Sequence, residues 1–275
     1  MARKITAHAF AFDFPLSPER TLLPMTRRRW IADEVSGNQA ALTGEHADHL
    51  VRVLRARVGQ EFEIATGDVV RRGYIISVRA GRVEFELGEE VPAASATDVT
   101  LLLAIFKFDR MEWAIEKCTE LGASRIVPVI ARRSDAHLAS SSAKRAERWR
   151  RVALQAAEQS RRASPPEIGA PIKVQDAVNL AAGALRIVLA ESEKRSRLRD
   201  VLASHPERPT VLAIGPEGGW AEDELQLFQN AGWISATLGS TILRAETAAI
   251  AAAAITISEL GVWLLTGRSA RENEP

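Results

Sequence analysis

A glycine-rich segment, Gly215–Pro216–Glu217–Gly218–Gly219, follows a short apolar run and is a first place where this sequence could bind a ligand. Glycines let a ligand approach the backbone closely. The segment is neither a GxGxxG dinucleotide fingerprint nor a Walker A loop. Pro216 lacks an N–H group and the P-loop lysine is missing, so the segment is poorly suited to bind phosphate. A tight turn into a helix with an acidic first turn explains the glycines equally well. Turn formation alone gives no reason for Glu217.

Charged residues also stand where two other apolar runs end. Arg244 and Glu246 lie at the corner between the last apolar run and an alanine-rich helix, and Glu191 follows an earlier run. In open α/β sheets, ligands bind outside the carboxyl ends of the strands, which is where these side chains fall. Capping of the helix by Glu246 or Thr247, together with one surface ion pair, is the alternative explanation.

The elements that must position these residues begin at Asp98, where continuous apolar runs start to alternate with helical patterns. This alternation predicts an α/β fold with a mostly parallel sheet that is covered on both faces. Asp109 is a candidate helix cap and Gly122 a helix stop. The predicted strands are residues 99–106, 125–131, 185–192, 210–215 and 234–239, and the predicted helices are 109–122, 142–163, 221–232 and 245–261.

The part of the chain before residue 92 has a different pattern. Short runs that alternate apolar and polar residues, punctuated by glycines, predict a small β-barrel or sandwich. A helix over residues 46–59 interrupts them, with Thr43 as its expected N-cap. Residues 92–97 are the expected linker, and residues 1–25 read as a loose extension. The predicted strands are residues 30–35, 61–67, 69–78 and 81–91.

Composition excludes several classes of protein. The chain has 275 residues, of which 46% are hydrophobic and 26% charged, so one large or two smaller folded domains are expected and wholesale disorder is not. The single cysteine, Cys118, excludes an intramolecular disulfide and multi-cysteine zinc sites, and it suggests a reducing compartment. The most apolar stretch, residues 247–258, is too short to span a membrane. A secretory signal is not expected.

Positive charge is concentrated although the net charge is only +1. Between Ile130 and Pro165, nine arginines and lysines face three acidic side chains, and Arg27–Arg28–Arg29 form a second cluster. Such patches can neutralise nucleic-acid phosphates. A solvated helix face is the alternative.

Together these segments resemble one family. The sequences GPEGG, LGSTILRAETA, EKCTELGASRIVPV and RWRRVALQAAEQSRRASPPEI are similar to motifs of the RsmE family of 16S ribosomal RNA uridine N3-methyltransferases. Those proteins are SPOUT methyltransferases with a C-terminal trefoil knot. RRRWIADEV and HADHLVRVLRARVGQEFEI resemble the PUA-like RNA-binding barrel of the same family. The resemblance covers residues 28–262.

The resemblance implies a PUA-like barrel at residues 26–94 and a knotted α/β methyltransferase domain at residues 97–265. It implies S-adenosylmethionine as cofactor, 16S ribosomal RNA in the small subunit as partner, a homodimer and a cytoplasmic location. Neither a metal nor a membrane is implied. The cofactor-binding residues it implies are Leu189, Ala190, Glu191, Gly215, Pro216, Glu217, Gly218, Gly219, Leu238, Gly239, Ile242, Leu243, Arg244, Thr247 and Ala248.

The reaction that the resemblance implies suggests roles for Arg244 and Glu246. Uracil N3 carries a proton at neutral pH, so its methylation needs a base and a group that stabilises the resulting negative charge. Arg244 is the candidate for stabilisation, and Glu246 is the candidate base or else a helix cap. The expected RNA-binding residues are Arg28, Arg29, His49, Arg52, Arg55, Arg132, Arg133, Arg161 and Arg162.

The sequence departs from the family pattern at Thr241, where arginine is usual, and at Ala221, where serine or threonine usually caps the following helix. Three other functions stay open. The protein could methylate another RNA position, including a ribose 2′-hydroxyl; it could bind RNA without catalysis; or it could be a Rossmann-type oxidoreductase, which the missing GxGxxG disfavours.

Overall fold

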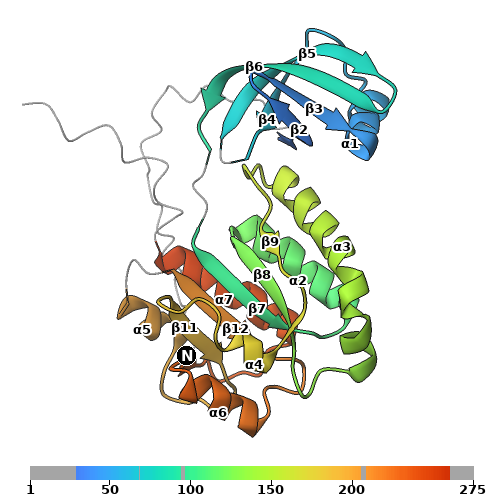
Figure 1. Ribbon diagram of the computed structural model, residues 1–275. Coiled ribbons are helices and arrows are strands. Elements are labelled where there is room, and N and C mark those ends of the chain that lie inside the picture. The colour runs from blue at the N-terminus through green and yellow to red at the C-terminus, as the bar shows by residue number, and fades with distance from the viewer. Residues whose placement is uncertain (1–28, 68, 94–96, 206–208, 261–275) are drawn as a thin grey trace, which may run out of the picture.

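The computed structural model describes residues 29–67, 69–93, 97–205 and 209–260. Arg28 of the expected RNA-binding set lies outside these ranges, as do the outer domain bounds at residues 26 and 265, which stay predictions. The described chain forms one sheet on each side of the expected linker. Figure 1 shows the first domain beyond one end of helix α3 (Ala136–Gln159) of the second domain. None of the helices within the described ranges is long and apolar enough to cross a membrane.

The first domain is a curled sheet of six strands in the order β1-β4-β5-β6-β3-β2. β1 pairs with β4 in parallel, and the other neighbours are antiparallel. Strand β3 was not predicted, because Ala40, Ala41 and Leu42 are all buried and give no alternation. The strands are β1 (Trp30–Ile31), β2 (Glu34–Ser36), β3 (Gln39–Thr43), β4 (Glu61–Ala65), β5 (Val70–Arg79) and β6 (Arg82–Val91).

The helix predicted over residues 46–59 is shorter and irregular. It consists of α1 (Gly44–Asp48) followed by a π-helical turn, η1 (His49–Val53), and Arg55 then takes a left-handed φ of 53°. Thr43 precedes the helix, but its side chain makes no capping hydrogen bond. The wider turn lets Leu50 and Ala56 both enter the barrel core, where Trp30 and Phe85 are also buried.

The second domain has a seven-stranded parallel sheet with the order β10-β8-β7-β12-β11-β13, and β9 adds to β8. Its strands are β7 (Val99–Ala104), β8 (Arg125–Ile130), β9 (Glu167–Ile168), β10 (Ile172–Lys173), β11 (Leu185–Leu189), β12 (Thr210–Ile214) and β13 (Ile234–Ala236). The remaining helices are α2 (Phe108–Leu121), α4 (Val174–Ala177), α5 (Leu198–Ala203), α6 (Glu222–Asn230) and α7 (Ala245–Glu259).

Helices cover both faces of this sheet, as the continuous apolar strands predicted. On one face Leu101 and Leu103 pack with buried residues of α2, α3, α5 and α7, among them Trp149. On the other face Leu102 and Ala104 pack with buried residues of α4 and the α6 region. Cys118 lies in the first of these cores, and burial raises the pKa of its thiol to about 12. It is an apolar filler, as expected for a lone cysteine.

Two predicted helix starts are wrong. α2 begins at Phe108 with Lys107 in the N-cap position, so that Asp109 lies in its first turn. α3 begins at Ala136, well before residue 142, because the carboxylate of Asp135 caps it by accepting hydrogen bonds from two backbone N–H groups at 2.8 and 3.1 Å. The stop at Gly122 is confirmed, since this glycine takes a φ of 120° directly after α2.

The C-terminal part of the chain crosses the carboxyl edge of the sheet. After the edge strand β13, the chain returns to α7, which packs against α2, β7 and β12 near the middle of the sheet. On the way, Thr237 forms backbone hydrogen bonds with Ser196 and Leu198 in the segment that follows β11. The knot that the resemblance implies would lie in this return past the segment that follows β11. The return gathers three loops at the carboxyl edge of the sheet, namely the first loop after β11 (190–197), the second loop after β12 (215–221) and the third loop after β13 (237–244).

Candidate functional site

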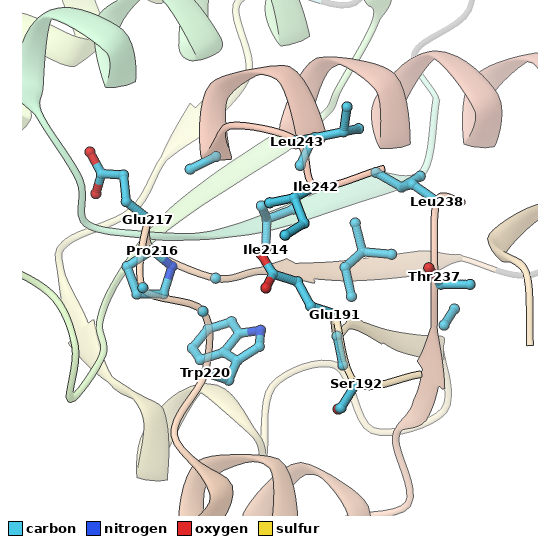
Figure 2. A pocket seen from close by; sticks show the side chains of 18 of the residues that line it. Glu191, Ser192, Ile214, Pro216, Glu217, Trp220, Thr237, Leu238, Ile242 and Leu243 are labelled. Atoms are coloured by element: carbon cyan, nitrogen blue, oxygen red, sulfur yellow. The ribbon is translucent and has the colours of Figure 1, made fainter. Parts of the chain in front are cut away.

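The three loops enclose a cavity of about 420 Å³ at the carboxyl ends of β11, β12 and β13 (Figure 2). The cavity therefore brings together segments that are far apart in the sequence. Most of the residues expected to bind a cofactor line this cavity, namely Leu189, Ala190, Glu191, Gly215, Pro216, Glu217, Gly218, Gly219, Leu238, Gly239, Ile242, Leu243 and Ala248. Arg244 and Thr247 do not line it; they are exposed at the beginning of α7.

The glycine-rich loop packs against large side chains on both sides. A Cβ atom at Gly215 would lie 3.3 Å from Nε1 of Trp220, and one at Gly218 would lie 3.4 Å from Cβ of Arg133. The guanidinium of Arg133 also donates a 2.8 Å hydrogen bond to the carbonyl of Gly218. Gly219 has a φ of 67° and closes the turn with a hydrogen bond to the carbonyl of Pro216. A Cβ atom at Gly215 would therefore press on the indole, one at Gly218 would make ordinary van der Waals contact, and the positive φ of Gly219 is the conformation that favours glycine.

A buried carboxylate fixes the end of this loop to the segment that follows β8. One oxygen of Glu224 accepts from the backbone N–H of Arg132 after β8 at 2.7 Å, and the other accepts from the N–H of Ala221 at 2.9 Å. Glu224 is 4% exposed. The second bond is the half of a capping box that a glutamate at the third helical position supplies, whereas Ala221 has no side-chain oxygen to supply the other half. Sequence reasoning noticed the helix-dipole effect of Glu224 but missed the bond to β8.

Backbone hydrogen bonds of Thr237 with Ser196 and Leu198 join the third loop to the first. Side chains within the first loop also hold its backbone. Lys194 donates to the carbonyl of Glu191 at 2.6 Å. Backbone N–H groups of Arg195 and Ser196 donate to Glu193 at 2.7 and 3.0 Å, and they lower the pKa of that carboxyl. Lys194 lines the cavity and was not predicted.

Trp220 is the cavity residue that sequence reasoning most clearly missed. It is 6% exposed and packs edge to face on Phe228, with ring centroids 5.0 Å apart. Its indole nitrogen is buried and has no hydrogen-bond partner among the described residues. The sequence did contain a signal for this role, because Trp220 directly follows a glycine-rich loop at the end of a predicted strand.

Glu246 lies in the first turn of α7 and is buried away from the cavity lining. Its side chain is 4% exposed, with one oxygen 3.6 Å from Nε of Arg110 on α2. The other oxygen, Oε2, is buried without a hydrogen-bond partner in the described residues. Neither Glu246 nor Thr247 provides an N-terminal cap, since Arg244 occupies that position and no side chain caps the helix.

Three arginines expected to bind RNA contact the protein itself. Arg29 is 4% exposed and donates to Glu63 at 3.0 Å and to the carbonyl of Arg161. Arg161 in turn donates to Glu63 at 2.6 Å, so this cluster joins the barrel to the end of α3. Arg162 donates to the carbonyls of Thr119 and Ala123, and burial lowers the pKa of its guanidinium to about 10.

Glu63 is the acidic centre of that cluster, which we call the domain junction (Arg29, Glu63 and Arg161). Burial is the largest influence on the pKa of Glu63 and raises it. Hydrogen bonds from Arg161 and Arg29, with their positive charges, outweigh burial and hold the pKa below its ordinary value. The carboxylate is therefore charged at neutral pH.

Most of the other expected RNA-binding residues within the described ranges are exposed. Arg52 is 78% exposed at its side chain, Arg55 is also exposed, and His49 is half-buried against the ring of Trp30. Arg132 and Arg133 are exposed beside the cavity, where Arg132 pairs with Asp223 at 2.5 Å. Across the described ranges, His, Cys, Asp and Glu side chains form no cluster that could hold a metal ion.

Comparison with known proteins matches this architecture to named relatives. The model of the RNA methyltransferase domain family matches residues 93–257. The chain is 35% identical over 243 residues to Ribosomal RNA small subunit methyltransferase E of Mycobacterium bovis, covering 85% of this chain and 89% of that protein. Identity to the Bacillus subtilis protein of the same name is 31% over 218 residues, covering 76% and 85%. The structure of the Neisseria gonorrhoeae enzyme of that name, bound to S-adenosyl methionine, superposes with a TM-score of 0.76 at 29% identity, covering 85% and 98%.

Proposed function

The chain belongs to the family of ribosomal RNA small subunit methyltransferase E, and from this membership we propose that it methylates N3 of a uridine in 16S ribosomal RNA. S-adenosylmethionine is the methyl donor. The observation that carries the proposal is the cavity in which the three expected cofactor loops meet.

The cavity fits this cofactor by its size and by the chemistry of its lining. A volume of about 420 Å³ lies within the range of small-molecule sites. Ile214, Leu238 and Leu243 supply apolar surface for a purine ring. The unpartnered indole N–H of Trp220 is a donor that a ligand can satisfy. Glycines at positions 215 and 218 leave the backbone accessible.

Bound S-adenosylmethionine supplies an electrophilic methyl group on a positively charged sulfur. The protein holds that group at the strand ends, and Leu238 and Leu243 of the third loop help to exclude water. Arg244 lies exposed at the start of α7, at the end of that loop, and it stabilises the negative charge that uracil gains when N3 loses its proton. Glu246, two residues further on, is held toward Arg110 and keeps the start of α7 in place. To accept the proton itself, its carboxylate must turn away from α2.

The RNA partner fits the positive charge that remains exposed. Lys144, Arg148 and Arg151 are exposed along α3, and Arg52 and Arg55 are exposed on the barrel. These side chains contact the phosphate backbone. The N3 edge of uridine is paired in a duplex, so the target base is unpaired or flipped out. For a protein that modifies small ribosomal subunits we expect a cytoplasmic location.

We also propose that the chain forms a homodimer in which a second copy covers the outer face of α7. Between Glu246 and Glu259, α7 carries no charged residue, and Ile250 and Ile255 are only partly buried. Trp113 on α2 is 48% exposed, and Ile242 before α7 is 82% exposed. A helix that is apolar on all sides is normally buried, and a homodimer buries it.

The direct test is methylation of purified small subunits that lack the modification, with labelled S-adenosylmethionine and mass spectrometry of the digested nucleosides. Label in 3-methyluridine is the expected result. Label in a 2′-O-methyl nucleoside keeps the methyltransferase but overturns the assigned position. Cofactor binding without any label contradicts catalysis on this substrate.

A further inference from the structure

Trp220 presents a buried hydrogen-bond donor to the cavity. The indole is 6% exposed, lines the cavity and packs under Gly215, where a Cβ atom would lie 3.3 Å from its Nε1. That nitrogen has no partner in the described part of the chain. Buried donors are rarely left unsatisfied, so an acceptor on a ligand is the natural partner.

Glu191 presents an acceptor to the same cavity. It follows β11, and Lys194 holds its backbone carbonyl at 2.6 Å. In Figure 2 the carboxyl group of Glu191 lies toward the middle of the cavity, above the indole of Trp220. The carboxyl group of Glu217, the acidic residue of the glycine-rich loop, points away from the middle. Of these two acidic residues, Glu191 is therefore the one positioned to meet a bound ligand.

A donor and a carboxylate that line one cavity select the chemistry of the ligand. A ligand carboxylate would be repelled by Glu191. A hydroxyl group satisfies both residues, because it accepts from the indole N–H and donates to the carboxylate. Two adjacent hydroxyls fit best, since each can donate to one carboxylate oxygen. The exocyclic amine of adenine could occupy only one of those oxygens.

We propose that Trp220 and Glu191 together recognise the two ribose hydroxyls of the cofactor. This inference rests on the proposed function, and it assigns the ribose to the wall formed by the first and second loops. It also assigns a role to Trp220, which no motif of the sequence predicted.

The test is a calorimetric titration with S-adenosylhomocysteine, which binds without reacting, and with its 2′-deoxy and 3′-deoxy forms. The wild-type protein is expected to bind the deoxy compounds about tenfold or more weakly, because a buried polar group is left unpaired. Trp220→Phe keeps an aromatic ring but removes the donor, and Glu191→Gln removes the charge. In both variants the parent compound should bind more weakly and the penalty for removing a hydroxyl should shrink.

Glu147→Gln is the matched control, because it removes the charge of an exposed carboxylate on α3 that does not line the cavity. It should leave both the affinity and the deoxy penalty as in the wild type. If Trp220→Phe and Glu191→Gln lose as much affinity as the wild type when a ribose hydroxyl is removed from the ligand, the ribose assignment is wrong. The assignment is also wrong if methylation of the adenine amine weakens binding to the wild type more than removal of a ribose hydroxyl does. In that case Trp220 and Glu191 contact adenine. Failure of wild-type protein to bind S-adenosylhomocysteine at all instead contradicts the proposed function.

Discussion

The cavity and the domain junction lie at opposite ends of α3 and are held together by different chemistry. Around the cavity, backbone hydrogen bonds, glycines and the buried carboxylate of Glu224 fix the three loops. At the junction, long charged side chains of Arg29, Glu63 and Arg161 connect the barrel to the other domain. A ligand that must approach the backbone needs loops held by backbone hydrogen bonds and glycines. Two preformed surfaces can instead be joined by long charged side chains.

The difference shows that an arginine cluster in the sequence can serve two purposes. Arg161 and Arg162 belong to the same basic stretch as Arg148 and Arg151. Arg161 binds Glu63 of the barrel and Arg162 binds two carbonyls of its own domain, whereas Arg148 pairs with Glu112 and Arg151 is exposed on α3. One basic stretch therefore contains arginines that brace the protein and an arginine, Arg151, that is exposed to meet phosphates.

The largest expected effect comes from breaking the buried connection at the cavity. Glu224→Ala leaves the N–H groups of Arg132 and Ala221 without their acceptor, which should cost about 2–4 kcal/mol of unfolding free energy. Affinity for S-adenosylmethionine should fall because the second loop loses its attachment to β8. Chemical denaturation and calorimetry measure both quantities. Gln226→Ala, an exposed change on the same helix, should alter neither, and equal behaviour of the two variants would contradict the account.

A smaller effect is expected at the junction. Glu63→Gln leaves Arg29, whose side chain is 5% exposed, without its counter-charge and should cost about 1–3 kcal/mol. Cofactor affinity should stay unchanged, while methylation of small subunits slows because the barrel is no longer held in place. Glu84→Gln, which removes an exposed pair with Arg82 within the barrel, is the control. Loss of cofactor binding in Glu63→Gln would show that the two regions are not independent.

The junction should also weaken in acid. The pKa of Glu63 is lower in the folded protein than its ordinary value of 4.5, so its contribution to stability is present above pH 4.5 and is lost as the pH falls through the folded pKa. The difference in unfolding free energy between wild type and Glu63→Gln should therefore shrink below pH 4.5. Denaturation curves at a series of pH values test this. A difference that stays constant down to strongly acidic pH would exclude Glu63 as its source.

The smallest effect is expected for a single exposed arginine on α3. Arg151→Ala removes one phosphate contact, so binding to small subunits should weaken a few-fold and the salt dependence of binding should fall by about one counterion. Thermal stability and cofactor affinity should not change. Arg199→Ala, on α5, is the matched exposed control. If both variants lose the same affinity for small subunits, α3 is not a specific part of the RNA-binding surface.

Strand–helix alternation predicted the architecture because both faces of the parallel sheet are buried, which makes runs such as residues 99–104 continuously apolar. The glycine-rich loop and LGSTILRAETA could be assigned to the site because family motifs keep their order along the chain. Contacts between distant residues could not be predicted. The bond of Glu224 to Arg132, the burial of Arg29 and the turn of Glu246 toward Arg110 each depend on packing that no local pattern encodes.

The most direct test of the account is a calorimetric titration of the full chain with S-adenosylmethionine, for the wild type and for Gly215→Val. A side chain at position 215 must displace the indole of Trp220, whose nitrogen would lie 3.3 Å from the added Cβ atom. The wild-type chain should bind one cofactor, and the folded Gly215→Val variant should bind it at least about tenfold more weakly. Equal binding by both proteins would contradict the assignment of the cofactor to this cavity.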